Sequence, residues 1–272
     1  MSDLAEDIAA AEAALAHAPI EPEARSAWLY RCWFHAAPMG DETPTPAQWP
    51  TRGAYRAAAL PHVPLEAGWR IAGPGGEGQV RIDNADGREG TAALINIVLD
   101  NPIAAPVPGA RLQRRRWLEQ DVGGFWHLWS EPWSLAPPER MQRLYLPLGP
   151  AAMLVAAAHL VAALPPDAMW AMKLLSGPHI PGRRDAGVIY LPHGALGSPF
   201  LDPLMAVFAP LLTGPRLRLT RPWWGGCVAD DPGGGRSFGE AVSHTLAGTD
   251  AGPDFAARAK AALAPLLGHL EG

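Results

Sequence analysis

Apolar positions at the start of the chain repeat with the period of an α-helix. Leu4, Ile8, Ala11 and Leu15 fall on one helical face, and acidic residues occupy the first turn, where the helix dipole favours them. The pattern predicts a helix through this segment and a second helix over residues 22–36. Further helices are predicted over 150–164, 199–212 and 236–248, and from Pro253 onward.

Alternating apolar and polar residues predict strands in the second half of the chain. In "MQRLYLPL" (141–148), Arg143 and Tyr145 fall on one face while Leu144 and Leu146 fall on the other. The other predicted strands are 91–100, 123–135, 168–175, 186–193 and an edge-like strand at 216–222, with two short strands around the Asn-Ala-Asp-Gly turn at 84–87.

Together these elements predict an α+β fold, in which helices pack on a mixed or antiparallel sheet. Residues 1–120 are expected to form a helical, loop-rich N-terminal region, because the segment before the first clear strand is rich in Pro and Gly. Residues 121–272 are expected to form the α+β region as one compact unit.

The composition is that of a globular protein, with 48% hydrophobic and 18% charged residues. The net charge of −5 argues against a nucleic-acid surface, although "RLQRRRW" (111–117) is either a solvated basic turn or a site for an acidic peptide or phosphate. No secretory signal is recognised, and the longest apolar run (148–166) is too short and interrupted to span a bilayer. We therefore expect a cytoplasmic protein without a membrane partner.

The sequence lacks the motifs of several kinds of phosphate-binding, catalytic and metal sites. The Gly-rich stretch 73–78 has no following Gly-Lys-Ser/Thr, so it is interpreted as a turn. There is no Gly-x-Ser-x-Gly elbow, and the two cysteines and nine histidines never take metal-ligand spacing. No metal and no cofactor are predicted.

A set of cations on predicted strands is the most informative chemical feature. The chain has 22 basic residues, of which only Lys173 and Lys260 are lysines. If neighbouring strands carry Lys173 and the arginines, their side chains can converge on a phosphate, which Arg binds bidentately. A lysine among cations and apolar walls has a lowered pKa and can act as a base. The arginines concerned are Arg143, Arg183 or Arg184, and Arg221.

Each of these residues also has an ordinary structural interpretation. A lysine at a strand end commonly extends to solvent. Arg143 and Arg221 can be surface residues of half-exposed strands, and Asp185 can simply pair with Arg183 or Arg184. The sequence leaves both interpretations open.

Residues 122–247 resemble the HopA-type family of type III effectors, whose relatives occur in thioamitide and class V lanthipeptide biosynthesis. The resemblance rests on an ordered series: "GFWHLWSEPW", "RLYLPLGP" with its apolar helix, "AMKLLSGP", "RRDAGVIYLP" and "RLTRPWWGGCVADDPGGGRSFG". The family is also distantly similar to phosphothreonine lyases.

The resemblance implies a phosphoserine or phosphothreonine lyase that acts on a ribosomally made precursor peptide beside a separate kinase-like protein. Elimination of phosphate would leave dehydroalanine or dehydrobutyrine. Neither the base nor the acid of the lyases transfers to this chain by identity. We assign Lys173 as base, because it is the only well-placed lysine, and Tyr145 as acid, with His127 or His179 as further candidates for the acid. Phosphate would be bound by Arg143, Arg183, Arg184 and Arg221. The Lys and His of the family's first strand read Arg143 and Tyr145 here, and Ala241 and Val242 stand where basic residues are expected.

Two other functions fit the same residues. A non-catalytic subunit could use the arginines as a groove for an acidic peptide or the kinase. A host-targeted effector is the third interpretation, although no translocation segment is evident in the sequence.

Overall fold

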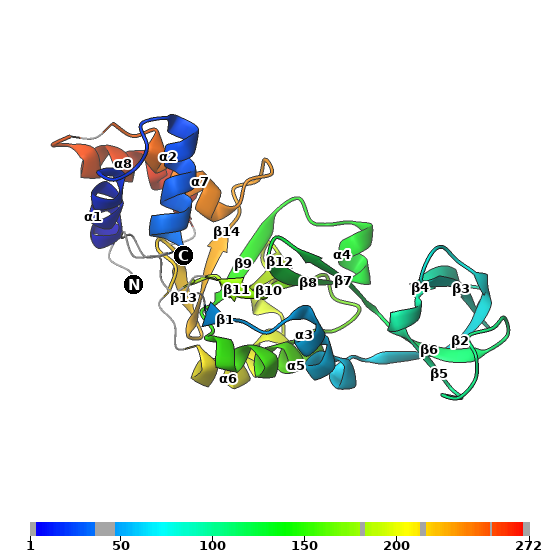
Figure 1. Cartoon of the computed structure of the whole chain (residues 1–272). Helices are drawn as coiled ribbons and strands as arrows, with labels where there is room; N and C mark the ends of the chain where they lie inside the picture. Colours follow the sequence, from blue (N-terminus) through cyan, green and yellow to red (C-terminus); the bar gives the residue numbers. More distant parts are fainter. Residues whose placement is uncertain (1–3, 36–46, 180–182, 213–215, 251, 269–272) are drawn as a thin grey trace.

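A computed structural model describes residues 4–35, 47–179, 183–212, 216–250 and 252–268. The fold is α+β, as predicted, and its centre is a seven-stranded antiparallel sheet with the order β13-β14-β9-β12-β10-β8-β7 (Figure 1). Its strands are β7 (Trp117–Val122), β8 (Phe125–Ser130), β9 (Met141–Leu146), β10 (Ala171–Leu175), β12 (Gly187–Pro192), β13 (Arg221–Trp223) and β14 (Gly226–Asp230).

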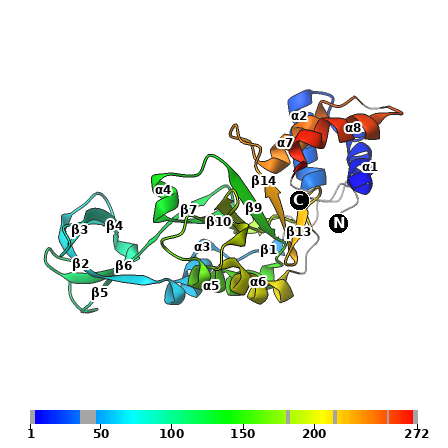
Figure 2. The ribbon, with the colours of Figure 1, turned by 180° about the vertical axis from the view of Figure 1, so that it is seen from behind.

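One face of this sheet is covered by helices. Leu144, Met172, Leu174 and Ile189 point from it into a buried core beneath α3, α5 and α6, which lie together on this side in Figures 1 and 2. Burial of these side chains removes apolar surface from water, and this is the main contribution to the stability of the sheet. The helices are α3 (Arg52–Ala59), α5 (Met153–Ala163) and α6 (Leu201–Phe208).

The other face is covered unevenly. A bundle of α1, α2, α7 and α8 packs over its β9–β14 end, and the short helix α4 lies on the same side toward β8 (Figure 1). The bounds are α1 (Leu4–Leu15), α2 (Pro22–Leu29) with its π-helical continuation (Tyr30–Phe34), α4 (Glu131–Leu135), α7 (Phe238–Ala247) and α8 (Phe255–Leu263). Between these helices the sheet face carries partly exposed side chains.

The start of α7 is fixed by its sequence. The Ser237 hydroxyl accepts from Glu240 N, and the Glu240 carboxylate accepts from Ser237 N, which is a complete capping box. The helix therefore holds Glu240 in one place beside the sheet.

A second sheet projects from the main body (Figure 1). It has five strands in the order β4-β3-β2-β6-β5 and its own small core, which includes Trp69, Ile71, Val80, Ile82 and Leu112. The strands are β2 (Leu65–Pro74), β3 (Gln79–Asn84), β4 (Glu89–Ala93), β5 (Ile97–Leu99) and β6 (Arg111–Arg115). A two-stranded pair joins β1 (Ala47–Gln48) to β11 (Pro178–His179).

The 3₁₀ turns complete the description: Leu60–His62, Leu94–Asn96, Pro150–Ala152, Ala195–Gly197, Ala209–Leu211 and Ala264–Leu266. Three strand predictions were wrong in extent. Of the segment 123–135, only Phe125–Ser130 is a strand, and Glu131–Leu135 form the helix α4. The segment 91–100 is divided between β4, a 3₁₀ turn and β5, and of 216–222 only Arg221 and Pro222 belong to a strand. The predicted boundary between residues 120 and 121 falls inside β7.

Among the helices of the described ranges, none combines the length and the apolar character that a membrane span requires.

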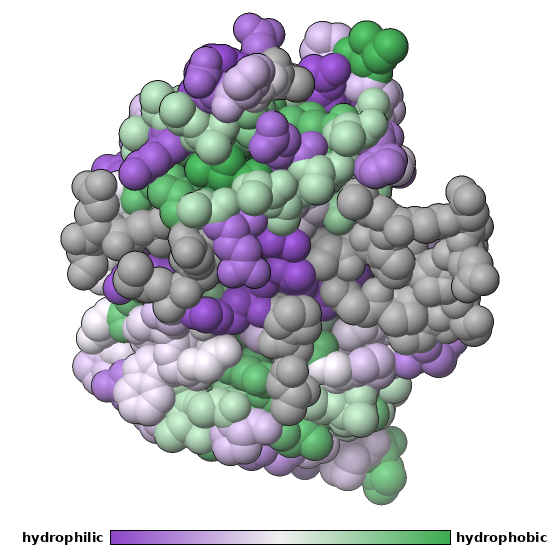
Figure 3. Space-filling view, turned by 90° about the vertical axis from the view of Figure 1, so that its left-hand side faces the viewer, coloured by the Kyte–Doolittle hydropathy of each residue, from purple (hydrophilic) through white to green (hydrophobic). Residues whose placement is uncertain are grey.

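Seen from the end at which α1 and α8 lie, the surface shows a group of hydrophilic residues at its centre (Figure 3). More apolar residues lie above and below this group. The hydrophilic surface therefore lies between the helix bundle and the helices on the far face of the sheet.

Candidate functional site

Two neighbouring rows of side chains run across the partly exposed face of the main sheet. In the first row His127 lies opposite Lys173, Lys173 opposite Val188, and Val188 opposite Tyr145. Directly opposed residues of antiparallel strands point to the same face, so His127, Lys173 and Tyr145 share one side of the sheet. The second row contains Trp129, Ala171, Tyr190 and Arg143.

Lys173 is the central cation of the site. Its Nζ lies 3.9 Å from Asp185 Oδ2 and 4.3 Å from the centre of the Phe125 ring, and its side chain is only 14% exposed. Burial lowers the pKa of Lys173, and Arg143 and Arg183 lower it further, while the carboxylate of Asp185 partly opposes them. The amine is therefore easier to deprotonate than an ordinary lysine.

Asp185 organises one side of the site. Arg183 donates to it through Nε and Nη2, both at 2.8 Å, and His35 Nδ1 lies 3.1 Å from Oδ1. Burial alone would raise the pKa of Asp185, but His35 and Arg183 outweigh it and hold that pKa well below its ordinary value. Asp185 is thus a permanent anion that fixes the Arg183 guanidinium.

Arg143 is held in a similar way on the other side. Its Nε donates to both oxygens of Asp231, at 2.7 and 2.8 Å, and its guanidinium lies 4.8 Å from the centre of the Tyr190 ring. Asp231 also accepts from Phe238 N at the start of α7. Within the described residues neither terminal amino group of Arg143 makes a hydrogen bond, so both remain able to donate to a ligand.

Three tyrosines surround Arg143. Burial raises the pKa of Tyr30, Tyr145 and Tyr190 above the ordinary value, and the neighbouring Arg143 only partly reduces the effect. These phenols therefore keep their protons at neutral pH. His127 behaves in the opposite way, because burial and the nearby Lys173 lower its pKa.

Not every predicted residue reaches this face. Arg184 turns away, and its Nη1 donates to the carbonyl oxygen of Arg216 at 2.9 Å. Arg221 lies opposite Val228, which belongs to the core on the other face of the sheet. His179 is in β11, and its side chain lies outside the described part of the structure.

Several residues of the site had no recognisable signal in the sequence. His35 and Tyr30 come from the N-terminal helices, while Asp231 and Glu240 follow the last strand. They approach Lys173 and Arg143 only because α2 and α7 pack on the same sheet face. Tyr190 could have been found, since it alternates with the buried Ile189 and Leu191 along β12 and shares a face with Val188.

A pocket of about 440 Å³ adjoins the site between α2 and α7. Tyr30 and Glu240 line it, and both are also electrostatic neighbours of Arg143. Across the described ranges, no group of three or more His, Cys, Asp or Glu side chains could hold a metal ion.

No protein-family model and no curated protein match the chain. The solved structures that are similar to it include two effector proteins from Pseudomonas syringae. The protein from pathovar syringae strain 61 has 14% identity, with 98% of this chain and 95% of that chain covered, and a TM-score of 0.48. The protein from pathovar tomato strain DC3000 has 18% identity over 52% of this chain, spans 58% of that chain and has a TM-score of 0.36. Likeness at this level carries no conclusion about activity.

Proposed function

We propose that the chain is a lyase that eliminates phosphate from phosphoserine or phosphothreonine in a peptide and leaves a dehydroamino acid. The observation that supports this most directly is Lys173, an amine of lowered pKa on the same sheet face as Arg143 and beside Arg183. A base next to guanidinium groups is the combination that β-elimination of phosphate requires.

In the proposed reaction the neutral amine of Lys173 takes the Cα proton of the phosphorylated residue. The electrons of that bond form the Cα=Cβ double bond, and the Cβ–O bond breaks. Phosphate leaves with the electron pair of the broken bond, and an acid protonates the leaving oxygen. No redox partner or metal is needed for this balance.

The arginines would bind the phosphate with the donors that their carboxylates leave unused. Arg183 uses Nε and Nη2 for Asp185, and Arg143 uses Nε for Asp231. The remaining guanidinium N–H groups can donate to phosphate oxygens and stabilise the charge that develops as the phosphate leaves. Arg184 and Arg221 have no part in this proposal, because they are directed elsewhere.

Tyr145 is the proposed acid. Its raised pKa keeps it protonated at neutral pH, and it lies on the same sheet face as Lys173. His127 is the nearer group by register, but its lowered pKa leaves it mainly neutral at pH 7. His127 is therefore the alternative acid.

The substrate that we propose is a precursor peptide phosphorylated by a separate kinase-like protein. The near balance of charge supports a second candidate, because Arg143 and Arg183 are each paired with a carboxylate. In that case the chain is a non-catalytic subunit that binds the peptide or the kinase.

The test is to incubate the protein with a synthetic phosphothreonine peptide and follow loss of phosphoric acid by mass spectrometry. We expect elimination by the wild type and at least a hundredfold slower reaction for Lys173→Ala. Lys260→Ala is the matched control, since this other lysine lies in α8, away from the sheet face, and should leave the rate unchanged. Absence of elimination by the wild type, with and without the kinase, would leave the binding-subunit interpretation. Full activity of Lys173→Ala would exclude Lys173 as the base.

A further inference from the structure

Aromatic side chains surround a small residue directly beside the proposed reaction site. In the second row, Ala171 lies between Trp129 and Tyr190, its opposed residues on the two neighbouring strands. Trp133 of α4 adds a third wall, with its ring centre 6.4 Å from that of Tyr190. All four side chains are partly exposed. We call this set, Trp129, Trp133, Ala171 and Tyr190, the aromatic notch.

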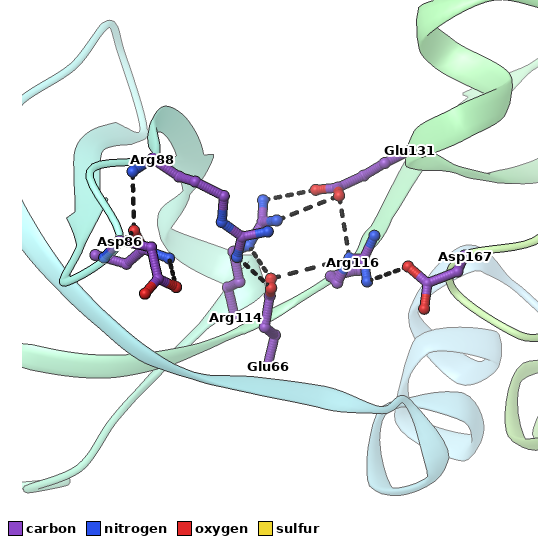
Figure 4. A network of polar contacts seen from close by, with 8 residues as sticks. Glu66, Asp86, Arg88, Arg114, Arg116, Glu131 and Asp167 are labelled. Atoms are coloured by element: carbon purple, nitrogen blue, oxygen red, sulfur yellow. Dashed lines mark hydrogen bonds and ion pairs between the residues drawn. The ribbon is translucent and has the colours of Figure 1, made fainter.

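Ion pairs from Arg114 of the second sheet and from Arg116, which follows it, hold the α4 wall of the notch in place (Figure 4). The Glu131 carboxylate, in the first turn of α4, accepts from Arg114 at 2.6 and 3.2 Å and from Arg116 at 3.1 Å. Arg114 also binds Glu66, and Arg116 binds Asp167. Because each arginine is anchored on two sides, the position of α4 does not depend on one exposed contact.

The start of α4 is also capped. The Ser130 hydroxyl accepts from Trp133 N at 3.4 Å, so the backbone that carries the Trp133 side chain is tied to the end of β8. Trp133 is therefore presented to the sheet face by a fixed element rather than by a free loop.

The indoles of the notch differ from several buried ones. The N–H groups of Trp117 and Trp126 donate to Asn96 and Glu119 respectively. Within the described part of the chain, the N–H groups of Trp129 and Trp133 have no acceptor. Exposed aromatic faces with unused N–H donors suit a surface that binds an apolar side chain and the nearby backbone of a ligand.

The spacing of the two rows fits an extended peptide. Ala171 and Lys173 are two residues apart on β10, which is about 6.6 Å along a strand. Alternate side chains of an extended peptide have the same separation and point to the same side. A peptide whose phosphorylated side chain lies over Lys173 therefore places its second neighbour over Ala171.

We propose that the aromatic notch binds a large apolar or aromatic side chain two positions from the phosphorylated residue. The proposal rests on the elimination function, because Arg183 and Arg143 bind the phosphate beside Lys173 and so fix the register of the peptide. The preference is one-sided. In the other direction along β10, Leu175 is fully buried and faces the buried Phe125 across the strands, so no second notch is available there.

The experiment uses fluorescein-labelled phosphothreonine peptides that carry Ala or Trp at position −2, −1, +1 or +2. Binding is measured by fluorescence anisotropy with Lys173→Ala, which prevents turnover, and elimination is measured with the wild type. We expect Trp at one of the two second positions to strengthen binding about tenfold, which corresponds to about 1.4 kcal/mol. Trp at position −1 or +1 should change the affinity less than twofold, because those side chains point away from the sheet.

Trp133→Ala, placed in the Lys173→Ala background, should abolish this preference. Trp224→Ala is the matched control, since Trp224 is a half-exposed tryptophan in the turn between β13 and β14. Equal binding of all peptides, or a preference that survives Trp133→Ala, would overturn the notch proposal even if phosphate is eliminated. The expected preference without any elimination by the wild type would support the notch and reject the lyase function.

Discussion

Lys173 and His127 lie directly opposite each other on β10 and β8, on the same face of the main sheet. Burial lowers the pKa of both groups, and the positive charge of Lys173 lowers the pKa of His127 further. Two cations at this spacing are unfavourable, so protonation of one side chain disfavours protonation of the other. This relationship makes the pH dependence of the reaction informative.

We expect kcat/KM for elimination to rise with pH through an apparent pKa below 10.5, the ordinary value for lysine, because Lys173 must lose its proton before it can act as a base. The rate should then stay level, since the raised pKa of Tyr145 keeps the proposed acid protonated. In the pH profile of kcat the rising limb should lie at higher pH, because a bound phosphate dianion stabilises the ammonium form of Lys173. Steady-state kinetics with a phosphothreonine peptide between pH 5 and 10 measures these limbs.

A different profile would reassign the acid. If His127 donates the proton, kcat/KM should fall as the pH rises above a value below 6.5, the ordinary pKa of histidine. His127→Gln should then remove that falling limb. If Tyr145 is the acid, His127→Gln should keep a level profile.

Asp185→Asn should destabilise the fold by about 3 kcal/mol at pH 7, because it leaves Arg183 without its buried anion. The pKa of Asp185 is lowered in the folded state, so the stabilisation is complete above the unfolded-state pKa of about 3.9 and is lost as the pH falls. Urea unfolding at pH 7 and pH 3 should show the difference between wild type and variant shrinking at the lower pH. An equal difference at both pH values would mean that the charge of Asp185 is not the cause.

The sequence predicted those parts of the fold that depend on local periodicity. Arg143 and Tyr145 do lie on one face, with Leu144 and Leu146 on the other, because a strand has a period of two. The helix of residues 236–248 ends at Gly248, as its pattern indicated. In the region of the five-stranded sheet, the sequence pattern predicted only two short strands and one separate strand. The reason is that the apolar alternation there is brief and interrupted by glycine.

The site itself depends on contacts between distant segments. Lys173, Arg143 and Arg183 could be grouped from the sequence because consecutive strands carry or precede them. No local pattern could show that β12 lies between β9 and β10, or that His35 would reach Asp185. For the same reason Arg221, whose segment matches the strand pattern, was grouped with residues of the opposite face.

Arg143 and Arg221 provide a matched pair for testing phosphate binding. Arg143→Lys keeps a positive charge but loses the planar fork between Asp231 and Tyr190, so we expect KM for a phosphopeptide to rise about tenfold. Arg221→Lys should change KM less than twofold, because Arg221 lies opposite Val228 on the other face. Both constants come from the same elimination assay. A larger effect of Arg221→Lys would contradict the assignment of faces.

Gly239 permits the close packing of α7 on the N-terminal helices. A Cβ at this position would approach Tyr30 Cε2 to 2.8 Å and would collide with the ring of Phe34. We therefore expect Gly239→Ala to destabilise the protein by about 2 kcal/mol, in spite of the higher helix propensity of alanine. Urea unfolding monitored by circular dichroism measures the change.

The same substitution should displace Tyr30 and Glu240, since both line the pocket between α2 and α7 next to Arg143. KM for a phosphopeptide should therefore rise severalfold in Gly239→Ala protein that is still folded under the assay conditions. Gly149→Ala is the control, because a Cβ at Gly149 meets no atom within 4 Å, and its stability should stay within about 0.5 kcal/mol of the wild type. Unchanged stability of Gly239→Ala would show that Phe34 and Tyr30 can move aside without cost, and that the contact between α2 and α7 does not fix the edge of the site.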